Sequence, residues 1–396
     1  MSTLKVNAIR QTTATSDAVT LASDGTCTVK ATNKSNRNLI INGAMQVAQR
    51  GTSSTTAGYG SVDRFQGVSG GGEEACTHSQ HALTSSDTGP WAEGFRSSFH
   101  FQNGNQTGGA GANDYAYIGY GVEAQDLAQS GWDYTSASSY ITLSFWVKCS
   151  VAGLQYGFMQ TPDGTGQGFS FSLGNLSANT WTKVTVKIPG NSNITINNDT
   201  GPGLWIHTGP FWGTDYTDSG NTLNTWAAYS SSSRTPDFPS TWWTTNDATF
   251  EITGVQLEVG DVATDFEHRS YADELARCQR YYYFHVGGAN TWTDGSSAPV
   301  ISMFYMWNTG SAFGYISFPV SMRTTPTADV SVGTDRIKCQ SAGVEDFCDA
   351  FTIGAAETHK NATRCYIYAD LSYTAGHAGI AFLNNNDAYI AFTAEL

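Results

Sequence analysis

Residues 250–284, FEITGVQLEVGDVATDFEHRSYADELARCQRYYYF, constrain the fold most, because their pattern changes twice within one short window. The stretch begins with the spacing of a β-strand, with a shift of phase at Gly254; its apolar positions are Phe250, Ile252, Val255, Leu257 and Val259. Ser270, with Asp273 three residues later, then predicts a helix N-terminus. Residues 281–284, Tyr-Tyr-Tyr-Phe, return to strand-forming types. The sequence therefore predicts a short helix between two β regions.

Composition indicates an all-β protein. The 396 residues suggest two or three domains at about 100 to 200 residues each. Charged residues make up only 14% of the chain, against about 25% in an average domain, while aromatic residues reach 13% and glycines number 42. A net charge of −14 argues against nucleic acid and anionic lipid as partners. No apolar run approaches the roughly 20 residues of a membrane span, so membrane insertion is not expected.

The first residues, MSTLKVNAIR, have no apolar core of a signal peptide, so we expect synthesis in the cytoplasm without export. The seven cysteines are odd in number and contain no C-x-x-C, which argues against a disulfide framework or a zinc site. Residues 1–36 read as an extended arm without aromatic residues; its apolar positions are Leu4, Val6, Ile9, Val19, Leu21 and Val29. An arm this short does not close a core alone. It is either an attachment arm that docks on another surface or on copies of itself, or a frayed terminus.

Strand patterns recur on both sides of the helix. Residues 140–149 alternate with one apolar face, and residues 181–188 repeat that pattern, which predicts an antiparallel sandwich. A second β unit should follow the helix, with its clearest strands in ISMFYMW, GYISFPVSMRTTPT, RCYIYAD and AYIAFTAEL. Residues 335–348 show no sustained alternation and are expected to form loops.

Three motifs carry a family resemblance: NLIINGAMQVAQRG at 38–51, SVDRF at 61–65, and residues 252–283. They resemble the jelly-roll, carbohydrate-binding-module-like domain of virion structural proteins and tail fibres of tailed bacteriophages. The resemblance covers residues 38–283 and fades between 201 and 246. FPVSMRTTPT at 318–327 resembles a strand and turn of the C-terminal domains that follow this jelly roll.

The resemblance and the patterns together give an all-β fold: an antiparallel jelly-roll sandwich, a short helix and a second, smaller β domain, preceded by an extended N-terminal arm. The expected domains are an attachment arm at 1–37, the jelly roll at 38–270, and the linking helix with the C-terminal β domain at 271–396. The resemblance implies a homotrimeric tail fibre in the virion, attached to other virion proteins through the arm.

The expected function is binding of host surface polysaccharide, without enzymatic activity. Two alternatives stay open: a polysaccharide depolymerase or esterase carried on the fibre, and a capsid-surface fibre without a receptor role. Residues 204–246 carry the richest set of aromatic residues among polar ones, which suits sugar rings. The candidate carbohydrate-binding residues are Trp205, Trp212, Tyr216, Trp242 and Trp243. Trp226 is assigned to the core. As a structural alternative, Trp226, Trp242 and Trp243 fill the inside of the sandwich or a subunit interface.

Other groups of residues give weaker indications of a functional site. Glu258 and Asp265 flank the last sandwich strand, and by the resemblance to carbohydrate-binding modules they are candidate ligands of a structural calcium ion; exposure of two acids at a strand end is the alternative. No other cofactor is expected.

Residues 67–71 match G-x-S-x-G but are expected to form a loop. His78 and His81 have H-x-x-H spacing without a third ligand nearby in sequence. Scattered carboxylates neither support nor exclude a glycosidase pair; they are Glu73, Glu74, Asp114, Glu123 and Asp126.

Overall fold

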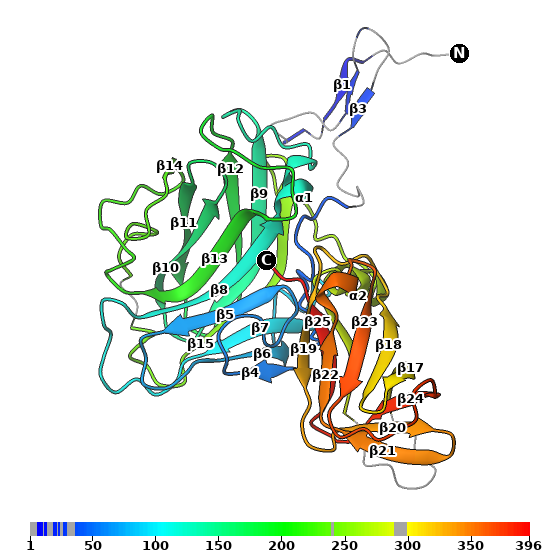
Figure 1. Cartoon of the computed structure of the whole chain (residues 1–396). Helices are drawn as coiled ribbons and strands as arrows, with labels where there is room; N and C mark the ends of the chain where they lie inside the picture. Colours follow the sequence, from blue (N-terminus) through cyan, green and yellow to red (C-terminus); the bar gives the residue numbers. More distant parts are fainter. Residues whose placement is uncertain are drawn as a thin grey trace.

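The computed structural model describes residues 6–10, 12–13, 19–21, 23, 27–29, 36–238, 241–288 and 299–396. The remaining residues of the predicted arm, Leu4 among them, lie outside the described residues. The described part of the arm contains a small antiparallel sheet with the order β1 (Ala8–Ile9), β2 (Val19–Leu21) and β3 (Cys27–Val29). In Figure 1 this sheet stands apart from the two larger β units.

Two six-stranded sheets form the larger unit. The first sheet has the order β14 (Trp226–Ala228), β11 (Gln167–Leu176), β10 (Gly153–Thr161), β13 (Pro202–Trp212), β8 (Tyr115–Glu123) and β5 (Phe65–Gly70). The second has the order β12 (Thr182–Pro189), β9 (Tyr140–Cys149), β15 (Thr249–Val259), β7 (Ser97–Gln102), β6 (Thr77–Ala82) and β4 (Ser53–Ser54). Every pairing in both sheets is antiparallel.

The core of this sandwich lies between the two sheets. One continuous cluster of buried apolar residues draws Ile118, Phe169 and Leu204 from the first sheet and Leu143 and Ile252 from the second. Burial of these inward-facing residues removes apolar surface from water at roughly 25 cal/mol per Å², which is the main stabilisation of such a fold. The alternating residues of the same strands face outward, where each sheet offers a second surface.

Helix α2 (Tyr271–Gln279) joins the two β units, as predicted. The Ser270 side chain accepts a hydrogen bond from the backbone N–H of Asp273, so the predicted cap is formed. The buried residues of the helix are Glu274 and Cys278. Glu274 is buried because its carboxylate accepts from the backbone N–H of Asn42 and pairs with Arg269. A second helix, α1 (Ala124–Ala128), follows β8.

The second β unit consists of two sheets that enclose their own core. The smaller sheet has the order β16 (Tyr282–Gly287), β25 (Tyr389–Thr393) and β19 (Thr327–Ser331). The larger has the order β21 (Val344–Cys348), β20 (Ile337–Ser341), β24 (Ala378–Leu383), β17 (Val300–Asn308), β18 (Ser311–Ser317), β23 (Ala362–Tyr368) and β22 (Ala350–Ile353). A 3-10 helix, η1 (Ala355–Glu357), precedes β23.

The loop predicted at 335–348 is wrong. These residues form the hairpin β20–β21, closed by Ala342 and Gly343, which both have positive φ angles of 52° and 79°. Two consecutive positive φ angles are typical of the tight turns that suit twisted hairpins, but alanine is rarely found there. The predicted all-β class, with an antiparallel sandwich, a short helix and a second β unit, is confirmed. The domain boundaries at 37/38 and 270/271 stay a prediction.

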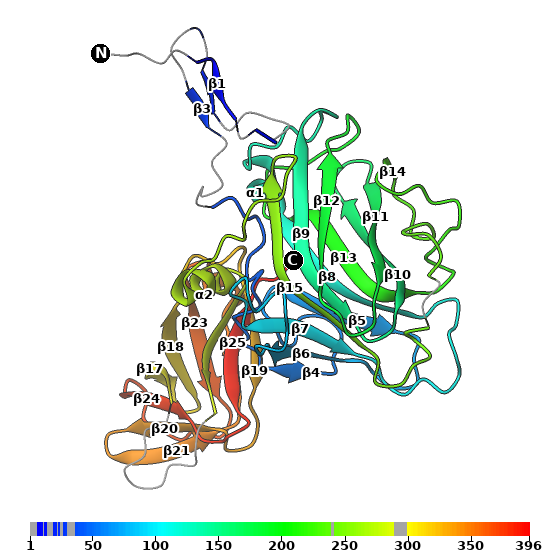
Figure 2. The ribbon, with the colours of Figure 1, turned by 180° about the vertical axis from the view of Figure 1, so that it is seen from behind.

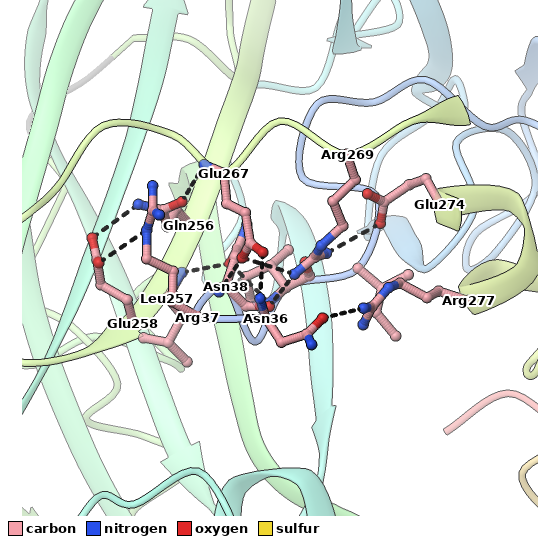
Figure 3. Close-up of polar contacts among 12 residues, drawn as sticks. Asn36, Arg37, Asn38, Gln256, Leu257, Glu258, Glu267, Arg269, Glu274 and Arg277 are labelled. Carbon is pink, nitrogen blue, oxygen red and sulfur yellow. Dashed lines mark hydrogen bonds and ion pairs between the residues drawn. The ribbon is translucent and has the colours of Figure 1, made fainter. Parts of the chain in front are cut away.

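Hydrogen bonds hold residues 36–43, which follow the arm, against β15 and α2. The backbone N–H of Leu39 donates to the carbonyl of Leu257, and the N–H of Val255 donates to the carbonyl of Gly43. The carboxylate of Glu267 accepts from the backbone N–H of Asn38 at 2.7 Å, and Figure 3 shows it among the polar contacts that tie this segment to the helix.

The chain ends between the two β units, as both Figure 1 and Figure 2 show. The hydroxyl of Tyr59, in the sandwich, donates to the carbonyl of Leu396 at 3.5 Å. Six of the seven cysteines are free and buried, as small hydrophobic residues often are; they are Cys76, Cys149, Cys278, Cys339, Cys348 and Cys365. Within the described residues, no helix has the length and apolar character needed to cross a membrane.

Candidate functional site

Three of the five predicted sugar-stacking residues are buried. Trp212, Trp242 and Trp243 are 2%, 0% and 1% exposed. Trp212 stacks on Tyr117 with ring centroids 4.6 Å apart, and Trp243 stacks on Phe211 at 5.3 Å. A ring whose faces are covered by the protein does not stack on a sugar, so the assignment of these three residues is wrong. Trp226 is buried in the sandwich core, as predicted.

Trp205 and Tyr216 are half-buried and belong to different places. Trp205, on β13, is paired with Gly121 on β8, whereas Tyr216 packs edge-on against Trp212 at 5.8 Å. The rings of His207 and Trp212 lie between them, with centroids 6.2 Å from Trp205 to His207 and 6.3 Å from His207 to Trp212. The two half-buried rings therefore do not form one platform.

The segments before and after β14 cover the outer side of the first sheet, with Tyr216 in the first segment and Arg234 in the second. The Arg234 guanidinium lies 4.8 Å from the Trp212 ring centroid and 4.9 Å from that of Tyr216. Burial, with a smaller effect from Arg234, lowers the pKa of His207 to about 3. His207 Nδ1 is buried, and among the described residues it has no hydrogen-bond partner. This cluster is a packed polar and aromatic layer, which serves stability more than recognition.

Beside that layer lies a hollow of about 320 Å³. Its lining includes Phe158, Ser170, Asn221, Thr222, Thr225 and Ser233. The hydroxyl and amide groups suit a polar ligand, but Phe158 is 2% exposed and offers no open ring face. The described residues of the segment 204–246 therefore form a polar hollow, and among them no exposed aromatic platform is found.

An exposed aromatic surface lies instead on the larger sheet of the second β unit. Trp307 and Tyr315 are 62% and 67% exposed, which is unusual for side chains of their size. They belong to a surface that we call the aromatic face, which consists of Met303, Tyr305, Trp307, Phe313, Tyr315, Arg364 and Tyr366.

Strand register brings these residues together. Tyr305 on β17 pairs with Phe313 on β18, and Phe313 pairs with Tyr366 on β23, so three aromatic side chains form one row across the sheet. Tyr315 pairs with Arg364 in the neighbouring row. Directly paired residues of antiparallel strands point to the same side of the sheet, with Cβ atoms about 4.5 to 5.5 Å apart. The opposite side of β17 carries Ile301, Phe304 and Met306, which belong to the core of the second unit.

The rings of the aromatic face support one another. Trp307 stacks on Phe313 at 5.5 Å with an interplanar angle of 17°, and Tyr366 packs edge-on against Phe313 at 4.7 Å. The Arg364 guanidinium lies 4.7 Å from the Phe313 centroid and also pairs with Glu357. A hollow of about 350 Å³ lies here, lined among others by Met303, Tyr305, Tyr315 and Arg364.

Such a surface offers open ring faces together with a hydroxyl and a guanidinium, and it binds ligands that present an apolar face edged by polar groups. The sequence contained a signal for it. In ISMFYMW, residues 301–307, large side chains occupy both sides of the predicted strand, although a strand at the edge of a core needs only one apolar face.

The two predicted calcium ligands have other roles. Glu258 accepts hydrogen bonds from the Thr264 backbone at 2.8 Å, the Thr264 hydroxyl at 2.6 Å and the Gln256 amide at 2.9 Å. The Arg37 guanidinium lies 3.6 Å from the same carboxylate (Figure 3). Asp265 contributes its backbone carbonyl to Arg37. Both oxygens of Glu258 thus have donors within the chain, and a calcium site at Glu258 and Asp265 stays a prediction.

The structure also shows where the remaining sequence motifs lie. Residues 65–70 are strand β5, so the loop predicted for G-x-S-x-G is wrong, and the element that follows is another strand rather than the helix of a nucleophile elbow. His78 is buried, with Nδ1 2.8 Å from the Ser61 hydroxyl, whereas His81 is exposed. Three residues apart on a strand, the two histidines point to opposite sides of the sheet. Glu123, one of the scattered carboxylates, pairs with Arg280 at 2.7 Å.

Comparisons with known proteins return likenesses among solved structures. No protein-family model and no curated protein matches the chain. Among solved structures, the enzymatically active domain of tailspike protein 4 of bacteriophage CBA120 matches with a TM-score of 0.30 and 11% identity, over 57% of this chain and 22% of that one. A putative sugar binding protein from Bacteroides thetaiotaomicron has a TM-score of 0.30 and 12% identity, over 56% of this chain and 100% of that one.

The CBM22-1 xylan-binding domain of Paenibacillus barcinonensis Xyn10C has a TM-score of 0.25 and 11% identity, over 55% of this chain and 97% of that one. Likenesses at these values do not assign a family or an activity to this chain. They do correct one expectation. Because a matched structure is an enzymatically active domain, the expectation that this chain is not an enzyme is withdrawn.

Proposed function

We propose that this chain is a carbohydrate-binding component of a tailed-phage fibre, and that the aromatic face contacts the glycan. The observation that carries the proposal is the exposure of Trp307 and Tyr315 on a rigid sheet, with the Arg364 guanidinium in the adjoining row. Sugar rings have apolar C–H faces that pack on indole and phenol rings, while their hydroxyls accept from and donate to polar groups at the edge. A neutral, hydroxylated ligand also suits a chain with a net charge of −14, which repels anions.

The further parts of the proposal are a homotrimeric state, attachment to other virion proteins through residues 1–37, and a location in the virion. They rest on the resemblance of the motifs at 38–51, 61–65 and 252–283 to phage fibre proteins. Exposed Ile9 and Leu21, in the small sheet of the arm, are consistent with docking of the arm on another surface.

Binding of the purified chain to immobilised host surface polysaccharide tests the carbohydrate proposal. Trp307→Ala and Tyr315→Ala should each weaken binding by about 1 to 2 kcal/mol, roughly five- to thirtyfold, as expected for an aromatic anchor. Tyr271→Ala is the matched control, because Tyr271 is 55% exposed but lies on α2, away from the aromatic face. Unchanged binding by both aromatic-face variants would reject this site.

Two further measurements on the same samples separate the remaining possibilities. Sedimentation equilibrium of Trp307→Ala tests whether the aromatic face instead joins copies of the chain, since loss of oligomers with retained glycan binding would assign the face to an interface. Release of reducing sugar from the polysaccharide tests whether binding is accompanied by cleavage.

A further inference from the structure

Three potential metal ligands meet on the outer side of the second sandwich sheet. They are His81 on β6, His100 on β7 and Glu251 on β15, which are neighbouring strands of one sheet. One ligand atom from each lies within 4.8 Å of the other two. His78 faces the opposite side, so the site does not contain the H-x-x-H pair read from the sequence.

Strand register fixes this arrangement. Glu251 pairs directly with His100, and His81 pairs with Ser98, which places His81 diagonally from His100 on the same side of the sheet. The alternating neighbours Phe99, Phe101 and Ile252 lie in the sandwich core. Because the core residues hold the strands in place, the three ligands are positioned by the scaffold and not by a mobile loop.

Distances among the ligand atoms already suit a metal ion. His81 Nδ1 lies 3.3 Å from Glu251 Oε2. Two donors in a tetrahedral site with bonds of about 2.0 to 2.1 Å are separated by about 3.3 Å. The rings of His81 and His100 have centroids 5.1 Å apart, and one ring nitrogen of each lies within 4.8 Å of the other.

Charges of both signs surround the site. The Ser98 hydroxyl donates to Glu251 Oε2 at 2.8 Å, and Lys148 Nζ lies 2.8 Å from the other oxygen, Oε1. Lys148 is shared with Asp87, whose carboxylate lies 3.3 Å away. Two carboxylates and one ammonium leave this cluster with a charge of −1.

We propose that His81, His100 and Glu251 form a binding site for one divalent transition-metal ion of the Zn²⁺ class. Two imidazole nitrogens and one carboxylate oxygen are a donor set that Zn²⁺ uses in proteins, whereas Ca²⁺ and Mg²⁺ prefer oxygen donors alone. The His81 side chain is 54% exposed, so the ion has access from solvent, and the fourth coordination position faces outward. The site is independent of the aromatic face, which lies on the second β unit.

Isothermal titration calorimetry of the untagged full chain with ZnCl₂, and separately with CaCl₂, tests the site. We expect one Zn²⁺ per chain, no Ca²⁺ binding here, and a higher melting temperature with Zn²⁺. His81→Ala and His100→Ala should each weaken Zn²⁺ binding by more than about 100-fold, because loss of even an outer-shell partner costs about 10- to 100-fold. His377→Ala is the matched control, since His377 is exposed on the second β unit.

Protonation provides an independent readout. Zn²⁺ binding should weaken as the pH is lowered, because the imidazoles must be neutral to bind the ion. His81 is exposed, so its replacement is expected to leave the fold intact, which the melting temperature of the metal-free variant verifies. Absence of stoichiometric Zn²⁺ binding, or equal binding by the parent, His81→Ala and His100→Ala, overturns the proposal.

Discussion

The guanidinium of Arg64 in the sandwich forms an ion pair with the carboxylate of Glu395, the penultimate residue, and the two side chains are only 1% and 7% exposed. Arg64 also donates to the carbonyl of Gly121 at 2.8 Å and lies 3.5 Å from the ring centroid of Tyr281. The Arg323 guanidinium donates to the backbone carbonyls of Ala394 and Glu395. The last residues of the chain therefore connect the sandwich to the second β unit through buried charges.

Removal of the Glu395 carboxylate should destabilise the protein strongly. Glu395→Ala leaves the buried Arg64 guanidinium without its counter-charge, at a cost of about 3 to 5 kcal/mol in the free energy of unfolding. Arg64→Ala should cost less, because Glu395 keeps its ion pair with Arg50 at 3.2 Å. Urea denaturation of each variant measures the loss. The exposed pair Lys187 and Asp261 provides the control, because Asp261→Asn should cost less than about 1 kcal/mol. Similar small losses at both pairs would show that the contact between the units is not a stabilising one.

The same contact leads to a prediction about the domain boundary. Fragments 38–270 and 271–396 should bind one another when mixed, because Arg64 and Glu123 of the first fragment have their partners Glu395 and Arg280 in the second. Size-exclusion chromatography of the mixed fragments tests this association. In the comparison mixture, the 271–396 fragment carries Glu395→Ala, and the two fragments should associate more weakly. Fragments that are folded yet elute separately would indicate independent domains joined only by the helix.

Local sequence signals predicted the parts of the fold that depend on neighbouring residues. Ser270 and Asp273 are three residues apart, so the cap of α2 could be read directly. The alternation at 140–149 identified β9, because one side of that strand faces the core. The hairpin β20–β21 escaped prediction since its turn uses Ala342 at a position where glycine, asparagine or aspartate is usual.

The candidate site was harder to predict because composition does not report orientation. The density of aromatic residues at 204–246 is real, but the chain folds back over the sheet and covers Trp212 with Tyr216 and Arg234. Trp307 is only one of the large residues in ISMFYMW, and sequence alone assigned them all to strand. Which side of that strand faces water follows from the pairing of β17 with β18 and β24, which is a long-range property.

Burial of Trp212 changes what its replacement should do. Trp212→Ala empties a site packed between Tyr117, Tyr216 and Arg234, so the protein should lose about 3 to 5 kcal/mol of stability. Trp226→Ala, in the sandwich core, should cost a similar amount. Thermal unfolding measures both losses. Glycan affinity, measured on the fraction that remains folded, should not change for either variant. A selective loss of affinity in Trp212→Ala would place the glycan-binding site in residues 204–246.

The buried imidazole of His207 should make the fold sensitive to acid. Its pKa is about 3 in the folded chain, against 6.5 for an exposed histidine, because burial disfavours the charged form. Between these two values the unfolded chain binds a proton that the folded chain does not, so the contribution of this residue to stability falls as the pH drops from 6.5 toward 3. The slope is up to about 1.4 kcal/mol per pH unit. His207→Gln should flatten the dependence of the unfolding free energy on pH across this range, and an unchanged slope would mean that other groups cause the acid sensitivity.

The oligomeric state should depend on the N-terminal arm. The strands β1 and β2 expose Ile9 and Leu21, and a sheet of three short strands is too small to bury such residues by itself. If the arms of three chains pack together, as the resemblance to phage fibres implies, their apolar side chains become buried from water, which one chain alone does not achieve. Sedimentation equilibrium at micromolar concentration should then give a trimer for the full chain and a smaller species for residues 36–396. Ile9→Ser together with Leu21→Ser should weaken the trimer without changing the melting of the sandwich, whereas a monomeric full chain would contradict the proposed fibre assembly.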